Sequence, residues 1–112
     1  MTLESVAIDI WRDPAVPTVT RVRNLMDQMT VPEKIAQLSS IWVGIDSAGE
    51  VAPHQHDNTT PAGWDEVIKD GLGQITRAFG TIPVDPAVGA KSLARSQQQV
   101  MAANRFGIPA MA

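Results

Sequence analysis

Two histidines and an aspartate stand close together in the sequence and have the residue types of a metal site. His54 and His56 are two residues apart, and Asp57 follows directly. A catalytic zinc site ordinarily has three protein ligands that are held by further contacts around them. No other obvious ligand accompanies this cluster, and the chain has no cysteine. We therefore expect a solvated polar loop that lines a cleft, with no metal and no cofactor.

Carboxylates are the second group with possible chemistry. Hydrolysis of a glycosidic bond needs two carboxyl groups that face each other, about 5–5.5 Å apart in retaining enzymes. Asp65 and Glu66 are neighbours on an expected helix, so their side chains point about 100° apart. The other candidate acids lie on an expected lead or loop, where solvation explains them: Asp9, Asp13, Asp46 and Glu50. No catalytic pair is therefore evident, and neither a serine elbow nor a cysteine nucleophile is present.

Arg77 and the tryptophans are candidate binding residues. Arg77 lies at the carboxyl end of an expected strand, where ligands gather in parallel α/β folds. A guanidinium there can bind hydroxyls or a carboxylate, although a structural salt bridge accounts for it equally well. Trp11, Trp42 and Trp64 can stack on sugar rings, but burial in a core is the commoner use of tryptophan. We assign substrate binding to Arg77.

Gly71 and Gly73 match the first two glycines of a dinucleotide-binding fingerprint. Thr76 stands where the third glycine belongs, and the run leads into an expected strand instead of leaving one. We therefore expect these glycines to form a tight turn from a helix into a strand.

The elements expected to position these residues begin with a lead and a helical corner over residues 1–40. Pro14 and Pro17 favour an extended lead. Apolar residues at steps of three and one predict a helix over residues 18–29 with Thr18 as its N-cap. Thr30 and Glu33 have the spacing of a capping box, which predicts a second helix up to about residue 39.

Residues 41–112 have the pattern of alternating strands and helices. We expect a loop over residues 46–63, a short helix over 64–72, a strand over 73–79, and a long helix over 86–105 capped by Asp85 and ended by Gly107. Residues 40–45 form a strand or the end of the preceding helix, and the final apolar run begins a buried strand. This order predicts parallel β-α-β winding. Because two or three strands cannot bury both faces of a parallel sheet, we expect residues 41–112 to be the first, truncated β/α units of a larger domain.

Composition excludes several classes of protein. The chain has 112 residues, a net charge of −3 and 44% hydrophobic residues. The acidic balance argues against a nucleic-acid partner, and no apolar run is long enough to span a membrane. The first residues lack the cationic flank of a secretory signal. We expect a cytoplasmic protein.

Four ordered motifs resemble the N-terminal segment of glycoside hydrolase family 3, in particular its β-xylosidase and β-glucosidase members. They are RDP at residues 12–14, MT-x-x-EKIAQL at 29–38, GLGQITR at 71–77 and NRFGIPA at 104–110. The resemblance implies an α/β fold, namely the N-terminal fragment of a (β/α)8 TIM-type barrel preceded by a helical lead. It also implies a retaining exo-β-glycosidase that acts on β-linked oligosaccharides or aryl glycosides.

In the family that these motifs resemble, an Asp attacks the anomeric carbon and a Glu acts as acid and base. Neither residue lies within this chain, so we expect the chain alone to be inactive. An alternative from a different class stays open, namely a small non-enzymatic interaction module whose helices at 18–29 and 86–105 pack on a partner.

Overall fold

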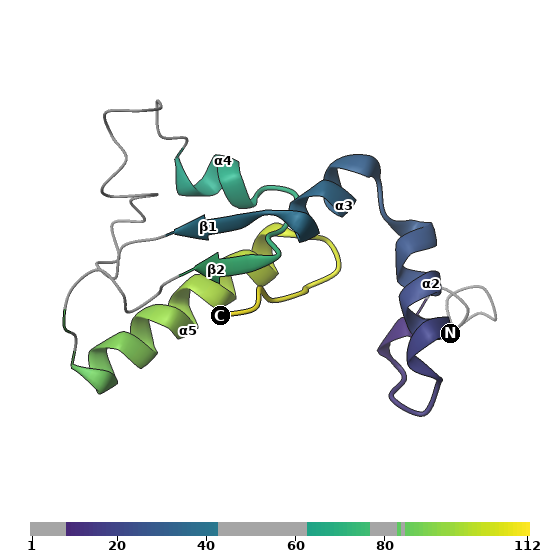
Figure 1. Ribbon diagram of the computed structural model, residues 1–112, viewed down its shortest axis with the longest axis horizontal. Coiled ribbons are helices and arrows are strands. Elements are labelled where there is room, and N and C mark those ends of the chain that lie inside the picture. The colour runs from purple at the N-terminus through teal and green to yellow at the C-terminus, as the bar shows by residue number, and fades with distance from the viewer. Residues whose placement is uncertain (1–8, 43–62, 77–82, 84) are drawn as a thin grey trace. The chain divides into compact units, whose positions relative to one another are not determined.

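The computed structural model describes residues 9–42, 63–76, 83 and 85–112 (Figure 1). It divides the chain into two compact units, Met1–Lys34 and Ile35–Ala112. We call them the first and the second unit.

The first unit consists of a short lead and one helix. The lead contains a 3-10 helix, η1 (Ile10–Arg12), followed by α2 (Thr18–Gln28). The backbone N–H of Trp11 donates to Asn24 Oδ1 over 3.2 Å, and Arg21 Nε donates to the carbonyl of Trp11 over 2.8 Å. These contacts turn residues 10–12 into a helical turn instead of the expected extended lead. Pro17 is the N-cap of α2, so the expectation that Thr18 caps this helix is wrong.

Helix α3 (Val31–Leu38) begins at the predicted capping box and crosses the boundary between the units. The N–H of Thr30 donates to Glu33 Oε2 over 2.8 Å, and the N–H of Glu33 donates to Thr30 Oγ1 over 3.4 Å. Each side chain therefore satisfies a backbone donor that the first turn of the helix leaves without a partner.

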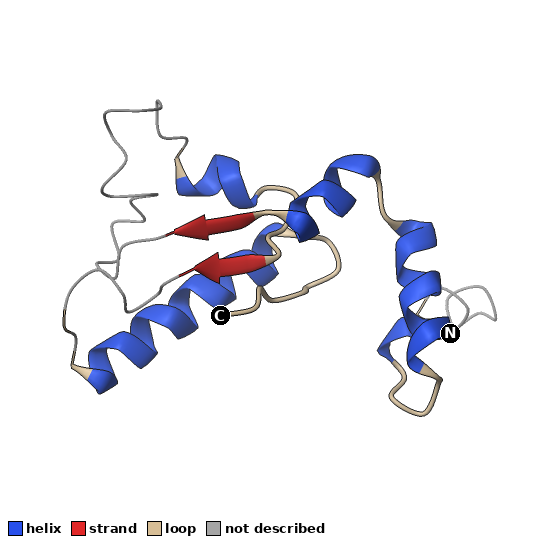
Figure 2. Cartoon of the chain, viewed as in Figure 1, coloured by secondary structure: helices blue, strands red, loops and turns tan. Residues whose placement is uncertain are grey.

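The second unit is built on a small parallel sheet (Figure 2). Strand β1 (Ser40–Trp42) pairs with β2 (Gln74–Thr76), and Ile41 stands opposite Ile75. An isolated parallel bridge joins Gln74 to Met111 on the other side of β2. The parallel direction expected between the strand at 73–79 and the final run is confirmed by this bridge.

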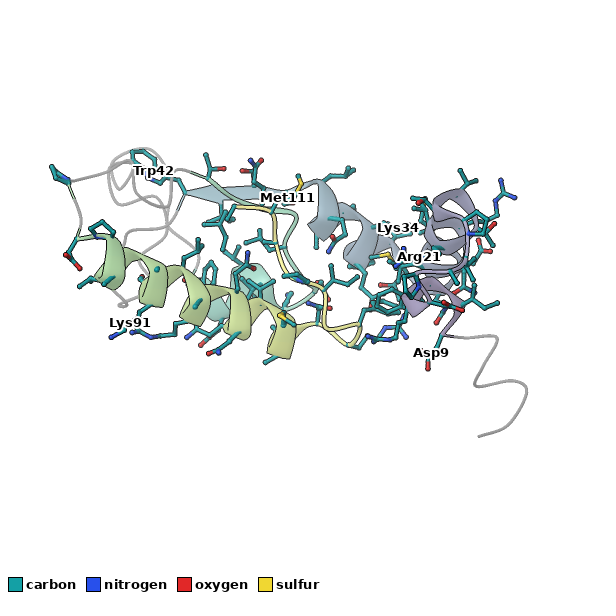
Figure 3. All side chains as sticks on the ribbon, turned by 90° about the horizontal axis from the view of Figure 1, so that it is seen from below. Asp9, Arg21, Lys34, Trp42, Lys91 and Met111 are labelled. Atoms are coloured by element: carbon teal, nitrogen blue, oxygen red, sulfur yellow. The ribbon has the colours of Figure 1, made fainter. Side chains whose placement is uncertain are left out.

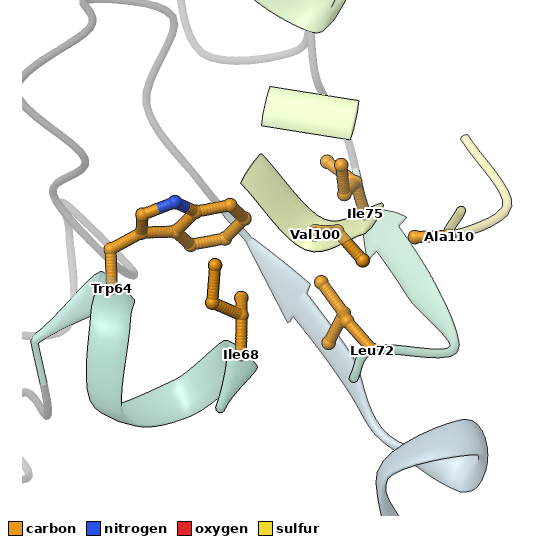
Figure 4. Close-up of a cluster of buried hydrophobic side chains, with 6 residues drawn as sticks. All are labelled: Trp64, Ile68, Leu72, Ile75, Val100 and Ala110. Atoms are coloured by element: carbon orange, nitrogen blue, oxygen red, sulfur yellow. The ribbon is translucent and has the colours of Figure 1, made fainter. Parts of the chain in front are cut away.

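Two helices cover one face of this sheet and enclose the core (Figure 4). They are α4 (Trp64–Ile68) and α5 (Pro86–Ala103). The carboxylate of Asp85 accepts the N–H of Val88 over 3.1 Å, so the predicted cap of α5 is confirmed. The core residues come from both helices, from β2 and the link before it, and from the last segment: Trp64, Ile68, Leu72, Ile75, Val100 and Ala110.

The fold class expected from the sequence is wrong. The part of the chain that the structure describes is mostly helical, and its sheet has two strands of three residues each and one further bridge. A two-stranded sheet with one further bridge is not the expected start of a TIM-type barrel. At Ala110, beside that bridge, the N–H and C=O are both bonded to the side chain of Gln97. A further strand therefore has no free backbone groups at Ala110.

Candidate functional site

The side chains of β1 and β2 alternate between the two faces of the sheet. Ile75 is buried in the core, and Ile41 packs against it. Because alternate residues of a strand point to opposite faces, four residues share the other face, which we call the outer sheet face: Ser40, Trp42, Gln74 and Thr76. Figure 3 shows Trp42 and Met111 on the side of the sheet opposite α5.

The outer sheet face is polar and only partly covered. Ser40 and Gln74 are exposed, and Trp42 and Thr76 are half-buried. Parallel sheets usually carry apolar residues on both faces, so polar groups here need another explanation. We take the outer sheet face as the candidate functional site.

Hydroxyl groups and an aromatic ring come together at this face. Ser40 Oγ and Thr76 Oγ1 form a hydrogen bond across the two strands. Trp42 stands opposite Thr76 in the register, at the carboxyl ends of both strands. Ligands of parallel sheets collect at this end. An indole beside hydroxyl and amide groups suits a hydroxylated ring, because the ring can stack on the indole and its hydroxyls can exchange hydrogen bonds.

Met111 is held beside the outer sheet face by backbone hydrogen bonds, and the side-chain amide of Gln97 holds the residue before it. The N–H of Met111 donates to the Gly73 carbonyl over 2.9 Å, and Ile75 donates to the Met111 carbonyl over 2.7 Å. Gln97 Nε2 donates to the Ala110 carbonyl over 2.6 Å, and Gln97 Oε1 accepts the Ala110 N–H over 2.9 Å. The side-chain amide of Gln97 therefore hydrogen-bonds to the backbone of Ala110, on the edge of this segment that faces away from β2.

Asn104 holds the chain just before this segment. Its Nδ2 donates to the carbonyls of Val100 and Ile108 over 2.8 and 2.9 Å. Its Oδ1 accepts the N–H of Ile108 over 3.0 Å. Gly107, with φ of 67°, makes the left-handed turn that the sequence predicts, and Asn104 closes that turn.

Residues from three of the four motifs meet in the second unit. A Cβ on Gly73 would overlap the backbone oxygen of Gln37. A Cβ on Gly71 would lie 3.2 Å from Gln37 Nε2 and 3.6 Å from Asn104 Cβ, and its φ is 108°. The N–H of Gly73 also donates to the Ala36 carbonyl over 2.9 Å. Glycine at 71 and 73 is therefore required by the approach of α3 and by the turn itself.

The residues assigned from the sequence fall mostly elsewhere. Arg77 directly follows β2 and lies outside the described residues, as do His54 and His56. Within the ranges that the structure describes, no three His, Cys, Asp or Glu side chains are grouped to hold a metal ion. In the same ranges no helix combines the length and apolar character needed to cross a membrane.

The three tryptophans have different environments. Trp64 is 8% exposed and its Nε1 donates to Gln99 Oε1 over 2.8 Å, so it belongs to the core. The guanidinium of Arg12 lies 4.1 Å from the ring centre of Trp11 in the first unit. Trp42 lies half-buried at the end of β1, on the outer sheet face.

The helix-borne acids form no catalytic pair. Glu66 accepts a hydrogen bond from Lys69 Nζ over 2.6 Å, and both side chains are exposed. This hydrogen bond and the charge of Glu66 raise the pKa of Lys69. Asp65 is exposed on the same helix. These groups have the character of a solvated helix surface.

Sequence reasoning missed the roles of Ser40, Thr76, Gln97 and Asn104. Gln97 and Asn104 continue the helical spacing of the apolar residues of α5. A polar residue at such a position indicates a buried hydrogen bond. No comparable local signal pairs Ser40 with Thr76, because they are far apart in the sequence.

Comparison with the models of known protein families and with curated proteins gives no match for this chain. The family resemblance therefore rests on the four motifs.

Proposed function

We propose that this chain is the N-terminal segment of a retaining exo-β-glycosidase that resembles glycoside hydrolase family 3. The segment supplies scaffold and a ligand-binding face, and the catalytic carboxylates belong to other parts of that enzyme. A cytoplasmic location, suggested by the composition, is part of the same proposal.

The meeting of Gln37, Gly71, Gly73 and Asn104 is the observation that supports the proposal most directly. These residues come from the motifs EKIAQL, GLGQITR and NRFGIPA. Motifs inherited as parts of one fold are expected to contact one another, since each residue then limits what its neighbours can be.

The outer sheet face gives the proposal a binding surface. In this proposal the indole of Trp42 stacks on one sugar ring of a β-linked oligosaccharide or aryl glycoside. Ser40, Gln74 and Thr76 exchange hydrogen bonds with its hydroxyls. Arg77 follows β2 directly and is proposed as a further substrate contact.

Assays with aryl β-xylosides and aryl β-glucosides test the enzymatic part. The complete reading frame that contains this segment is expected to hydrolyse at least one of them with retention of configuration. The 112-residue chain alone is expected to show no turnover above buffer, because it lacks a nucleophile. Turnover by the chain alone contradicts the proposal, as does a complete protein that hydrolyses neither class.

Binding to the outer sheet face is tested separately. Trp42→Ala is expected to weaken the binding of a methyl β-glycoside about tenfold, in line with the loss of one stacking contact of roughly 1–1.5 kcal/mol. Trp11→Ala, in the first unit, is the matched control and should leave binding unchanged. Equal loss in both variants would contradict a site at Trp42.

A non-enzymatic interaction module remains a second candidate, because α2 and α5, the two helices assigned to it from the sequence, carry exposed apolar residues. Val19, Val22 and Met26 are exposed on α2, and Val88 and Met101 on α5. Hydrolysis by the complete reading frame would decide against this candidate.

A further inference from the structure

Helix α2 has one face in contact with the lead and another without a described partner. Trp11 bonds to Asn24 and Arg21 on the first face. On the other face Val19 is 70% exposed, Val22 50% and Met26 47%. A depression of about 400 Å³ follows this second face, which we call the α2 groove; its lining residues are Thr18, Val19, Val22, Arg23, Met26 and Asp27. Apolar side chains in such a row gain free energy when another surface covers them.

The charged rim of the α2 groove indicates which surface that is. Arg23 and Asp27 lie one helical turn apart and both line the groove. The order Arg then Asp is the weaker one for an ion pair within a single helix. A partner that matches this rim presents an acid opposite Arg23 and a base opposite Asp27. A second α2 running in the opposite direction presents this arrangement.

We propose that the α2 groove binds the α2 groove of a second copy of this chain, with the two helices antiparallel about a two-fold axis. Such an interface uses the same surface on both copies. The inference does not depend on the glycosidase proposal.

Helix geometry supports the antiparallel arrangement. With the axis level with Leu25, Arg23 and Asp27 each lie two residues from it, so Arg23 of each copy faces Asp27 of the other. At a rise of roughly 1.5 Å per residue, Val22 lies about 4.5 Å and Met26 about 1.5 Å from the axis on opposite sides. The four apolar side chains therefore alternate along the interface instead of colliding. A parallel pair would place the two charged rims on opposite sides and leave both charges unmatched.

The size of the groove predicts a weak dimer. Helix α2 has 11 residues and is therefore about 16 Å long. Two such helices bury much less than the roughly 1,200 Å² of a stable specific interface. We expect self-association that depends on protein concentration, with the monomer dominant in dilute solution.

Complementary charge reversals test the proposal by sedimentation velocity over a range of protein concentrations. Arg23→Asp gives a rim with two acids, and Asp27→Arg gives a rim with two bases. Each variant alone is expected to self-associate about tenfold more weakly than the unmodified chain, because like charges meet in both rim pairs. An equal mixture of the two is expected to form heterodimers, since every acid then faces a base.

The controls separate the interface from folding and from net charge. Arg95→Asp, on an exposed position of α5, makes the same change of charge and should leave association unchanged. Circular dichroism checks that each variant keeps its helix content, and the mixture adds an internal check, since a helix that had melted would not be rescued by its counterpart. The proposal is overturned by an unmodified chain that stays monomeric at all concentrations. It is also overturned by single variants that associate like the unmodified chain, or by a mixture that stays monomeric.

Discussion

The two units of this chain are held together by different interactions. Among the described residues of the first unit, none is buried. Its lead is fixed to α2 by two hydrogen bonds: the Trp11 N–H donates to Asn24 Oδ1, and Arg21 Nε donates to the Trp11 carbonyl. The second unit encloses a core cluster of six buried apolar residues and adds side-chain amides that bond to the backbone. Hydrogen bonds near the surface set geometry with a small net gain, whereas burial of apolar area provides most of the stability.

Local opening should therefore differ between the units. The described residues of the first unit are exposed or half-buried, so this unit should open at low cost in free energy. The second unit should resist opening until its core is disrupted.

The largest effect is expected for Gly73→Ala, which would disrupt the second unit. The new Cβ would overlap the backbone oxygen of Gln37, and backbone cannot move aside as a flexible side chain can. We expect a loss of about 3 kcal/mol or more in the free energy of unfolding, measured by urea denaturation. Gly63→Ala is the matched control, because nothing lies within 4 Å of a Cβ there. Equal stability of the two variants would contradict the close approach of α3 to β2.

Truncation of one valine to alanine in each unit compares how much side-chain burial stabilises the two units. Val100 is 0% exposed in the second unit, and Val22 is 50% exposed in the first. Val100→Ala should cost about 2 kcal/mol through lost burial and a cavity. Val22→Ala should change stability by less than about 0.5 kcal/mol. Urea unfolding at low protein concentration measures both, and similar costs would mean that the units do not differ as described.

A third comparison concerns asparagines that bond to the backbone. Asn104 is buried, and Asn104→Ala removes its hydrogen bonds to Val100 and to the N–H and C=O of Ile108, so we expect a loss of about 2 kcal/mol. Asn24→Ala removes the acceptor of the Trp11 N–H at a half-buried position, and we expect about 1 kcal/mol or less. In Asn24→Ala, amide hydrogen exchange should become faster only near Trp11. Global destabilisation by Asn24→Ala would show that the first unit is more cooperative than we infer.

Modest effects are expected at two helix caps, one in each unit. Asp85→Ala removes the acceptor of the Val88 N–H, and Thr30→Ala removes half of the capping box of α3. Each should cost about 1 kcal/mol, and Asp85→Asn should restore most of the loss. Thermal melting followed by circular dichroism checks this order. A cap variant that destabilises more than Val100→Ala would contradict the leading role of the core.

The sequence by itself determined the features that depend on near neighbours. The capping box at Thr30 and Glu33, the Asp85 cap of α5 and the left-handed turn at Gly107 all follow from contacts within a few residues, and all three are confirmed. The parallel direction of the bridge between Gln74 and Met111 was also predictable, because a long helix connects the two segments.

The tertiary structure alone decided what depends on residues distant in the sequence. The final apolar run was expected to begin a buried strand, and it forms a single bridge at Met111. Local periodicity does not record that the Gln97 side chain bonds the backbone of Ala110. The pairing of Ser40 with Thr76 and the contact of Gly73 with Gln37 likewise arise from the register of β1 and β2 and the approach of α3. Side chains that meet across the fold are selected by the packing of whole elements, and no short stretch of sequence contains that information.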